Sequence, residues 1–271
     1  MKLDLVKEVT AFVISVGDTA NFTDCMNHLE NQTSAFTIKI IKNVAPMSAA
    51  FQKMIDACTT PYYIQVDEDM LLWPFAIEEL YNSIAACEGN VGIVCAPLWD
   101  WDIELPLYGI KIYRYCVASL FPYSNKASCE MDQLDRMAAI GYRFKLLPLS
   151  KRNCRGEHGK HYSKQSIFLR WQRLFEKHRR TGHISWIEAW PEKLLERYMR
   201  TREEIHLFAL LGAISGIACP IPEDCSIDFR SDATAFAQMT KYFRTPADKA
   251  LNAQRAAINS LYKKNMLGEK T

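Results

Sequence analysis

Apolar runs alternate with amphipathic stretches through the first part of the chain. Three runs with the β-branched and aromatic character of buried strands lie at residues 10–16, 37–41 and 62–66. Between them, apolar side chains recur at helical spacing over residues 22–32 and again over residues 48–58. This order of strands and helices predicts an α/β fold whose sheet is mainly parallel and flanked by helices.

The alternation continues to about residue 150, and long helices follow it. Two more helices are expected at residues 75–87 and 129–140. Three more strands are expected at residues 91–96, 110–115 and 142–148. Beyond Ser150 the pattern is helical over long stretches, at about 163–180, 189–217 and 231–264. We therefore predict one domain over residues 1–162 and a helical C-terminal region over residues 163–271.

Three acids, Asp67-Glu68-Asp69, directly follow the apolar run at 62–66. Burying three carboxylates without partners is very costly, so we expect them at the carboxyl end of the strand, where open α/β sheets bind ligands. Asp67 and Asp69 could there hold a divalent cation through oxygen ligands. The alternative is a solvated turn before a helix, with Asp69 near the helix N-cap.

Composition excludes several classes of protein. A hydrophobic content of 49% and a charged content of 24% are ordinary for a globular protein. The nine cysteines contain no CxxC pair, so neither a zinc ribbon nor a disulfide framework is indicated. The first nine residues lack the apolar core of a signal peptide, and the apolar stretch at 207–222 is too short to span a bilayer. These observations predict a cytoplasmic protein.

Charge is distributed unevenly along the chain. Residues 1–150 carry 11 Lys and Arg against 18 Asp and Glu, whereas residues 151–204 carry 14 against 7. The basic part could face an anionic membrane or a diphosphate, but it lacks a recognised nucleic-acid module, so we expect no nucleic-acid partner. Residues 168–180 form a basic aromatic stretch that could make a peripheral membrane contact. A solvated helix face is the alternative.

Four segments, taken in order, resemble the family-2 glycosyltransferases. They cover about residues 10–165 and are CMNHLENQT at 25–33; AAFQKMIDA at 49–57, which runs into Asp67-Glu68-Asp69; EMDQLDR at 130–136, followed by Gly141-Tyr142-Arg143; and HGKHYS at 158–163. The resemblance implies the nucleotide-sugar-binding GT-A fold and the DxD motif. Three places depart from the family pattern: Lys42-Asn43 stands where the family often has an Asp, Phe51-Gln52 replaces Arg-Asn, and Cys129 replaces the first acid of the third segment.

The resemblance also implies an activity. It is that of an inverting, metal-dependent glycosyltransferase that moves a sugar from a UDP- or GDP-linked donor to a glycan or lipid-linked acceptor, with bacterial surface polysaccharide synthesis as a possible setting. Asp69 would bind Mn²⁺ or Mg²⁺, and His158 would contact the metal or the diphosphate, with His161 as the alternative. The expected donor-binding residues are Val16, Asp18, Gln52 and Asp67.

An inverting displacement also needs a base for the acceptor hydroxyl. The resemblance places Glu130 at the position of the base and Asp132 second, although both acids would also suit an ordinary helix N-terminus. Trp99, Trp101 and Arg114 are the candidates for acceptor binding, with loop packing as the alternative for the tryptophans. Two other functions stay open: a sugar nucleotidyltransferase, and a non-catalytic nucleotide-sugar-binding protein.

Overall fold

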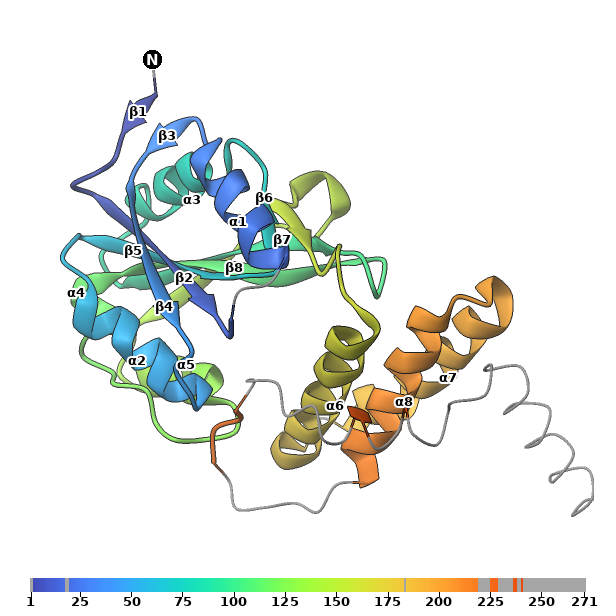
Figure 1. The fold of residues 1–271 in the computed structure, drawn as a ribbon. Coiled ribbons are helices and arrows are strands. Elements are labelled where there is room, and N and C mark those ends of the chain that lie inside the picture. Colours follow the sequence, from blue (N-terminus) through green and yellow to red (C-terminus); the bar gives the residue numbers. More distant parts are fainter. Residues whose placement is uncertain are drawn as a thin grey trace, which may run out of the picture.

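A central sheet organises the computed structural model, which describes residues 2–17, 20–182, 184–218, 225–228, 236–237 and 240 (Figure 1). In these residues the sheet has eight strands. In spatial order they are β4 (Thr37–Lys42), β2 (Val9–Ser15), β5 (Tyr62–Asp67), β8 (Leu105–Arg114), β7 (Val91–Asp100), β10 (Gly156–His158) and β6 (Met70–Leu72), with β9 (Arg143–Leu146) paired to β7. Strands β1 (Leu3–Asp4) and β3 (Ser34–Ala35) form a separate parallel pair.

The sheet is mixed in direction. Strands β4, β2 and β5 are parallel, as the alternation of strands and helices predicts. Strand β8 is antiparallel to both β5 and β7 because it follows β7 through the short turn at residues 101–104. The expectation of a mainly parallel sheet is therefore correct for the first three strands and wrong at β8 and at the antiparallel pair β10–β6.

Helices cover both faces of the sheet (Figure 1). One face carries α1 (Ala20–Glu30) and α3 (Ala76–Ala85), and the other carries α2 (Met47–Ala57), α4 (Tyr115–Ala118) and α5 (Cys129–Ala139). Each face has its own apolar core, in which Leu29 and Leu80 pack on one side and Phe51 and Met54 on the other. A 3₁₀ turn at Lys151–Asn153 precedes β10.

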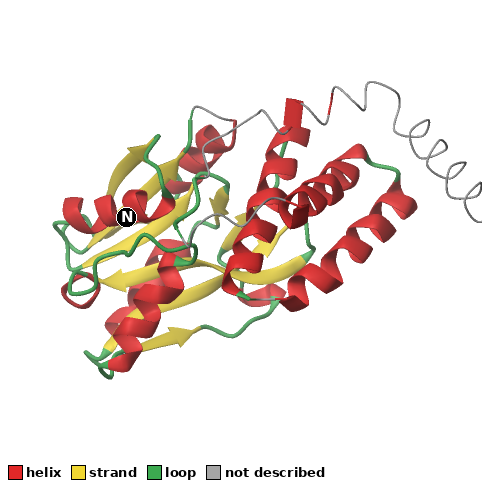
Figure 2. Ribbon diagram, turned by 90° about the horizontal axis from the view of Figure 1, so that it is seen from below, coloured by secondary structure: helices red, strands yellow, loops and turns green. Residues whose placement is uncertain are grey.

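The C-terminal region begins with α6 (Lys164–Thr181), α7 (Ile184–Thr201) and α8 (Glu204–Ala218), which lie together beside the sheet (Figure 2). The predicted α/β fold with a helical C-terminal region is confirmed. The single helix expected at 189–217 is wrong, because the chain breaks at Arg202, whose φ of 58° is left-handed. The helix expected at 231–264 lies almost entirely outside the described residues.

The aromatic side chains of α6 face the protein interior. Phe168, Trp171 and Phe175 are fully buried, so they are not available to a membrane surface. This removes the physical basis of the membrane contact expected at residues 168–180, which required these rings at an interface. Among the helices that the structure describes, none combines the length and the apolar character needed to cross a bilayer.

Candidate active site at the carboxyl end of β5

The three acids form the turn between β5 and β6. Asp67 is the last residue of β5, and Met70 begins β6 after the turn residues Glu68 and Asp69. Residues 63–66 are buried, while all three acids are only partly buried. The acids therefore lie at the strand end, as the sequence predicts, rather than before a helix.

Glu68 has a structural role that the sequence did not suggest. Its backbone N–H donates to the carbonyl oxygen of Ile14 at 3.1 Å, and its Oε1 accepts from the N–H of Val16 at 3.4 Å. These contacts fix the end of β2 beside the acidic turn. Val16, an expected donor-binding residue, is therefore placed next to the acids, whereas Asp18 lies outside the described residues.

Strand β10 brings His158 to the same place. It inserts between β6 and β7, and its register sets His158 opposite Met70 on one side and opposite Asp100 on the other. The backbone N–H of Gly159 then donates to the carbonyl oxygen of Asp69 at 3.1 Å. Residues nearly ninety positions apart in sequence thus meet because a short strand joins the ends of β6 and β7.

His158 bridges two carboxylates. Its Nδ1 lies 2.7 Å from Oδ2 of Asp100, and its Nε2 lies 3.3 Å from Oδ1 of Asp69. The hydroxyl of Tyr162 donates to the other oxygen of Asp69 at 2.5 Å. Gly159 permits this approach, since its φ is 71° and a Cβ there would lie 2.4 Å from the Tyr162 ring.

Asp100 anchors this group from inside the protein. Its side chain is fully buried, and its Oδ1 accepts from the backbone N–H groups of Asp102 and Ile103. Its Oδ2 accepts from Arg170 of α6 at 2.6 Å in addition to its contact with His158. A buried carboxylate with this many donors is stable as an anion. It can therefore hold the imidazole ring in one orientation.

The charges in this group perturb one another. Burial lowers the pKa of His158, but the carboxylates of Asp69 and Asp100 outweigh that effect and raise it to about 10. Burial likewise raises the pKa of Asp69, but His158 and the Tyr162 hydroxyl bring it well below its usual range. With no metal present, the group therefore consists of a protonated imidazole between two ionised carboxylates.

Asp67 and Glu130 form a second acidic pair. Burial, followed by the charges of Asp69 and Glu130, raises the pKa of Asp67 to about 6. Glu130, at the start of α5, accepts from Nζ of Lys111 at 2.6 Å, and both side chains are 18% exposed. Lys111 of β8 lies opposite Gln65 of β5, and Gln65 comes two residues before Asp67. The structure therefore brings Glu130 to the same strand end as Asp67.

The other expected catalytic acid, Asp132, points elsewhere. It accepts from Ser124 at 2.8 Å, from Lys126 at 2.6 Å and from Arg136 at 2.9 Å. Burial raises its pKa, but these hydrogen bonds dominate and lower it to about 2. All of these partners belong to α5 or to the loop before it, so Asp132 fastens that loop.

Arg114 does not join the group. It pairs with Tyr62 at the opposite end of β5 from Asp67, and its guanidinium donates to backbone carbonyls of Ile84, Cys87 and Val91. It thus closes the C-terminal end of α3. Arg114, expected to bind the acceptor, lies away from Glu130 because β8 is antiparallel to β5 and carries its last residue away from the acidic turn.

Gln52 and the two tryptophans also have packing roles. The side-chain oxygen of Gln52 accepts from the N–H of Tyr123 at 2.9 Å, and its amide donates to Asp56. Trp99 and Trp101 flank the buried Asp100, and Lys151 lies 4.1 Å from the Trp99 ring centre. Trp101 is 45% exposed beside the backbone of His158, to whose carbonyl it donates. Of these three residues, Trp101 is the one that presents a face to solvent beside the site.

Asp69 and His158 have the chemistry of two ligands to one cation. Oδ1 of Asp69 is buried and makes no hydrogen bond of standard geometry, and the positive charge that faces it is the His158 imidazolium at 3.3 Å. Adjacent ligands of an octahedral ion at about 2.1 Å lie about 3 Å apart, close to the 3.3 Å separation of Oδ1 and Nε2. Within the described residues, however, no group of three or more His, Cys, Asp or Glu side chains converges as a complete metal cage.

Two residues of the site were not identified from the sequence. Asp100 lies between the two tryptophans expected at the acceptor, and Arg170 lies within the basic stretch at 168–180, but no pattern in the sequence singles out either one. Asp100, like Asp67, directly follows an apolar run typical of a strand. This likeness could have indicated that both strands end at the same edge of the sheet. Strand β10 has only three residues, so its sequence has no pattern that predicts its register. That register places His158 beside Asp100.

Comparisons with known proteins give distant similarities in structure alone. No protein-family model and no curated protein matches the chain. A mannosyltransferase from Pyrobaculum calidifontis, solved in complex with GDP-Man and Mn²⁺, is similar with a TM-score of 0.46 and 12% identity, over 96% of this chain and 82% of that chain. Two enzymes of methylerythritol metabolism each match 55% of this chain. The 4-diphosphocytidyl-2C-methyl-D-erythritol synthase from Anaerococcus prevotii has a TM-score of 0.41, 6% identity and 90% of its own chain covered. The 2-C-methyl-D-erythritol 4-phosphate cytidylyltransferase from Thermus thermophilus has a TM-score of 0.39, 9% identity and 92% covered.

Proposed function

We propose that this protein is an inverting, metal-dependent glycosyltransferase that uses a nucleotide-diphosphate sugar. The observation that carries the proposal is the pairing of Asp69 with His158 at the end of β5, where Oδ1 and Nε2 lie 3.3 Å apart. A diphosphate bound there would supply the remaining oxygen ligands that the described residues do not. Mg²⁺ and Mn²⁺ are bound in this way, by one or two protein side chains together with substrate phosphates.

The site residues would divide the work. Asp69 and His158 would hold the cation, which when bound neutralises charge on the leaving diphosphate. Asp100, itself held by Arg170, orients the imidazole through Nδ1, so His158 could release its Nε2 proton to solvent and bind a metal ion without moving. Asp67, which Glu68 separates from Asp69 in the sequence, would face the ribose of the donor. Val16 and Trp101 would border the donor and the acceptor.

Glu130 is the proposed base. It would accept the proton of the acceptor hydroxyl as that oxygen bonds to the anomeric carbon and the bond from carbon to the diphosphate breaks. Burial raises the pKa of Glu130, but Lys111 and Lys177 lower it below its ordinary value. The carboxylate is therefore ionised at neutral pH and ready to accept a proton.

A matched pair of variants tests this role. Glu130→Gln should lower kcat by about 10²- to 10⁴-fold, because it removes general-base catalysis, while donor binding stays intact. Asp132→Asn is the control on the same helix and should change kcat by less than about threefold once folding is verified. The measurement is release of nucleoside diphosphate from UDP- and GDP-sugars in the presence of mixed glycan acceptors. Equal activity of Glu130→Gln and the parent protein would refute the assignment of the base.

The Lys111–Glu130 pair favours one alternative, a sugar nucleotidyltransferase. The partly buried Lys111, near the end of β5, could neutralise a phosphate, with Glu130 serving only to orient it. That enzyme would consume a nucleoside triphosphate and a sugar phosphate and release pyrophosphate. Lys111→Met would then abolish activity, whereas Glu130→Gln would retain most of it. Identification of the released product, nucleoside diphosphate or pyrophosphate, separates the two reactions directly.

A further inference from the structure

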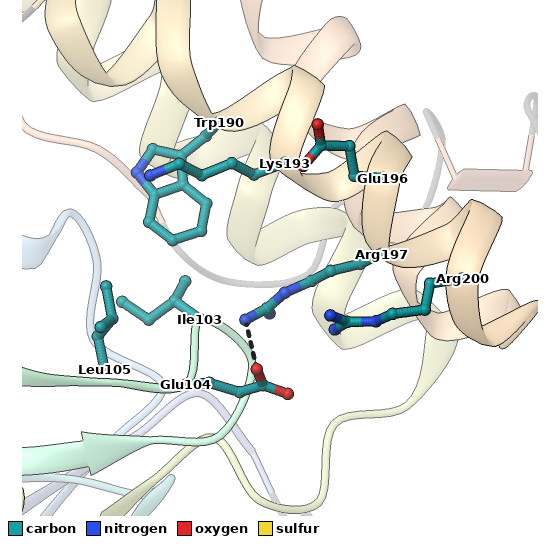
Figure 3. Close-up of a pocket in the computed structure, with 8 residues that line it drawn as sticks. All are labelled: Ile103, Glu104, Leu105, Trp190, Lys193, Glu196, Arg197 and Arg200. Carbon is teal, nitrogen blue, oxygen red and sulfur yellow. Dashed lines mark ion pairs between the residues drawn. The ribbon is translucent and has the colours of Figure 1, made fainter.

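A cavity separate from the acidic turn lies between the β7–β8 turn and α7 (Figure 3). Its volume of about 510 Å³ falls within the roughly 300–1,000 Å³ of small-molecule sites. Ile103 and Leu105 of the turn and Trp190 of α7 give it an apolar wall. Trp190 is 6% exposed and packs against Trp171, so this wall is part of the core of the helical region.

Beyond Trp190, the α7 wall carries three basic side chains and one acid, Glu196. Lys193, Arg197 and Arg200 follow Trp190 at intervals of three and four residues, so they share one face of α7. Figure 3 shows the two guanidinium groups side by side, directed toward the turn that carries Glu104. Two arginines on adjacent helical turns can bind one phosphate through paired N–H groups.

Part of this basic wall lacks acceptors. Nη1 of Arg197 is buried with no hydrogen-bond partner, although Nη2 lies 3.1 Å from Oε2 of Glu104. Arg200 makes no ion pair within the described part of the chain. Glu104 is 56% exposed and has a left-handed φ of 55°, a backbone conformation that non-glycine residues rarely adopt. The Glu104 carboxylate thus pairs with one nitrogen of Arg197, and the cavity has room for further anionic oxygens.

We propose that this cavity binds a phosphate-bearing small molecule whose apolar or planar part packs on Leu105, since Trp190 is buried and Lys193 lies 4.8 Å from its ring centre. Arg197 and Arg200 would contact the phosphate, and Glu104 would compete with it for Arg197. The site is separate from the donor site at Asp69. The two are connected through the turn, because Asp100 and Asp102 precede Glu104 and contact Arg170 of α6.

Calorimetric titration of the full-length protein with inorganic phosphate and with phenyl phosphate tests the proposal. Phenyl phosphate should bind about fivefold or more tightly than inorganic phosphate, because its ring covers the exposed side chain of Leu105. Arg200→Gln should weaken both ligands by about tenfold. Arg152→Gln removes an exposed arginine outside the cavity and should leave both affinities unchanged, which controls for net charge.

Glu104→Gln gives a result of the opposite sign. It releases Arg197 from its internal ion pair and removes a repulsive charge, so phosphate should bind about threefold or more tightly. Weaker binding in this variant, or equal binding by Arg200→Gln and Arg152→Gln, would overturn the site. Equal affinities for phenyl phosphate and inorganic phosphate would overturn the part assigned to Leu105.

The phosphate could belong to the nucleotide donor or to a different molecule, and a crossed experiment distinguishes them. GDP and UDP are titrated with Mn²⁺ into Asp69→Asn and Arg200→Gln, in parallel with phenyl phosphate. We expect Asp69→Asn to lose nucleotide but keep phenyl phosphate, and Arg200→Gln to do the reverse. Loss of nucleotide binding in Arg200→Gln alone would place the donor in this cavity and overturn a separate site. Because phenyl phosphate binding does not depend on Asp69, this proposal and the proposed function can fail independently.

Discussion

At the residue scale, the structure separates acids that look alike in the sequence. Asp69 keeps a buried oxygen that makes no standard hydrogen bond and faces only the His158 imidazole, whereas both oxygens of Asp100 accept hydrogen bonds. Asp132 is held by three side chains of its own helix and of the loop before it. A carboxylate whose acceptor sites are filled serves structure, and one with an empty site can serve a ligand. The sequence predicts where these acids gather but not which of them is already satisfied.

Asp132 should contribute stability that depends on pH. Its pKa is lowered to about 2, so its contribution is complete above the unfolded-state pKa near 4 and disappears as pH falls toward 2. Asp132→Asn should therefore lower the free energy of unfolding by about 1–2 kcal/mol at pH 7. Urea titrations at pH 7, 4 and 3 should show the difference from the parent protein shrinking at the lowest pH. A difference that grows on acidification would contradict the assigned hydrogen bonds.

At the element scale, long periodic segments were predictable and short strands were not. The strands at 10–16, 37–41 and 62–66 and the helices between them are confirmed within a few residues as β2, β4, β5, α1 and α2. Strands β6 and β10 have three residues each, too few for a period of two to be recognised. Their pairing nevertheless fixes the position of His158. The resemblance quoted for the segment 158–163 identified this histidine without revealing the register that positions it.

Helices α6 and α8 approach closely at two glycines. A Cβ at Gly212 would lie 2.2 Å from the backbone oxygen of Phe168, which cannot rotate away. Gly212→Ala should therefore lower stability by about 1–3 kcal/mol, as overpacking commonly does. Gly89→Ala, which places its methyl group in open space, is the matched control and should have little effect. Thermal unfolding monitored by circular dichroism measures both, and equal melting temperatures would contradict this packing.

At the scale of the whole molecule, a short late segment joins the helical region to the sheet domain. Arg180 of α6 donates to the carbonyl of Cys225, and Ser226 donates to Asn125 of the loop before α5. The N–H groups of Met47 and Ser48, at the start of α2, donate to Ile227 and Ser226. Helix α2 begins after Pro46 without a side-chain cap of its own, so residues far along the chain satisfy its first donors. No local sequence pattern predicts such a contact.

Ser226→Ala tests how much this contact contributes to the free energy of unfolding. Its hydroxyl accepts from a buried backbone N–H, so the substitution should cost about 1 kcal/mol, as the loss of an N-cap does. Urea unfolding at pH 7 measures the change. Ser226→Thr, which keeps the hydroxyl, should recover part of the loss, and equal destabilisation by both substitutions would point to packing instead of the hydrogen bond.

The most direct test of the account is nucleotide binding with and without Mn²⁺. Calorimetric titration of GDP and UDP should show that one of them binds at least about tenfold more tightly with Mn²⁺, because Asp69 and His158 share the cation with the diphosphate. Asp69→Asn should abolish this enhancement, while Asp135→Asn, an exposed Asp on α5, should preserve it. Metal-enhanced binding that survives in Asp69→Asn, or no enhancement in the parent protein with either nucleotide, would contradict the proposed site.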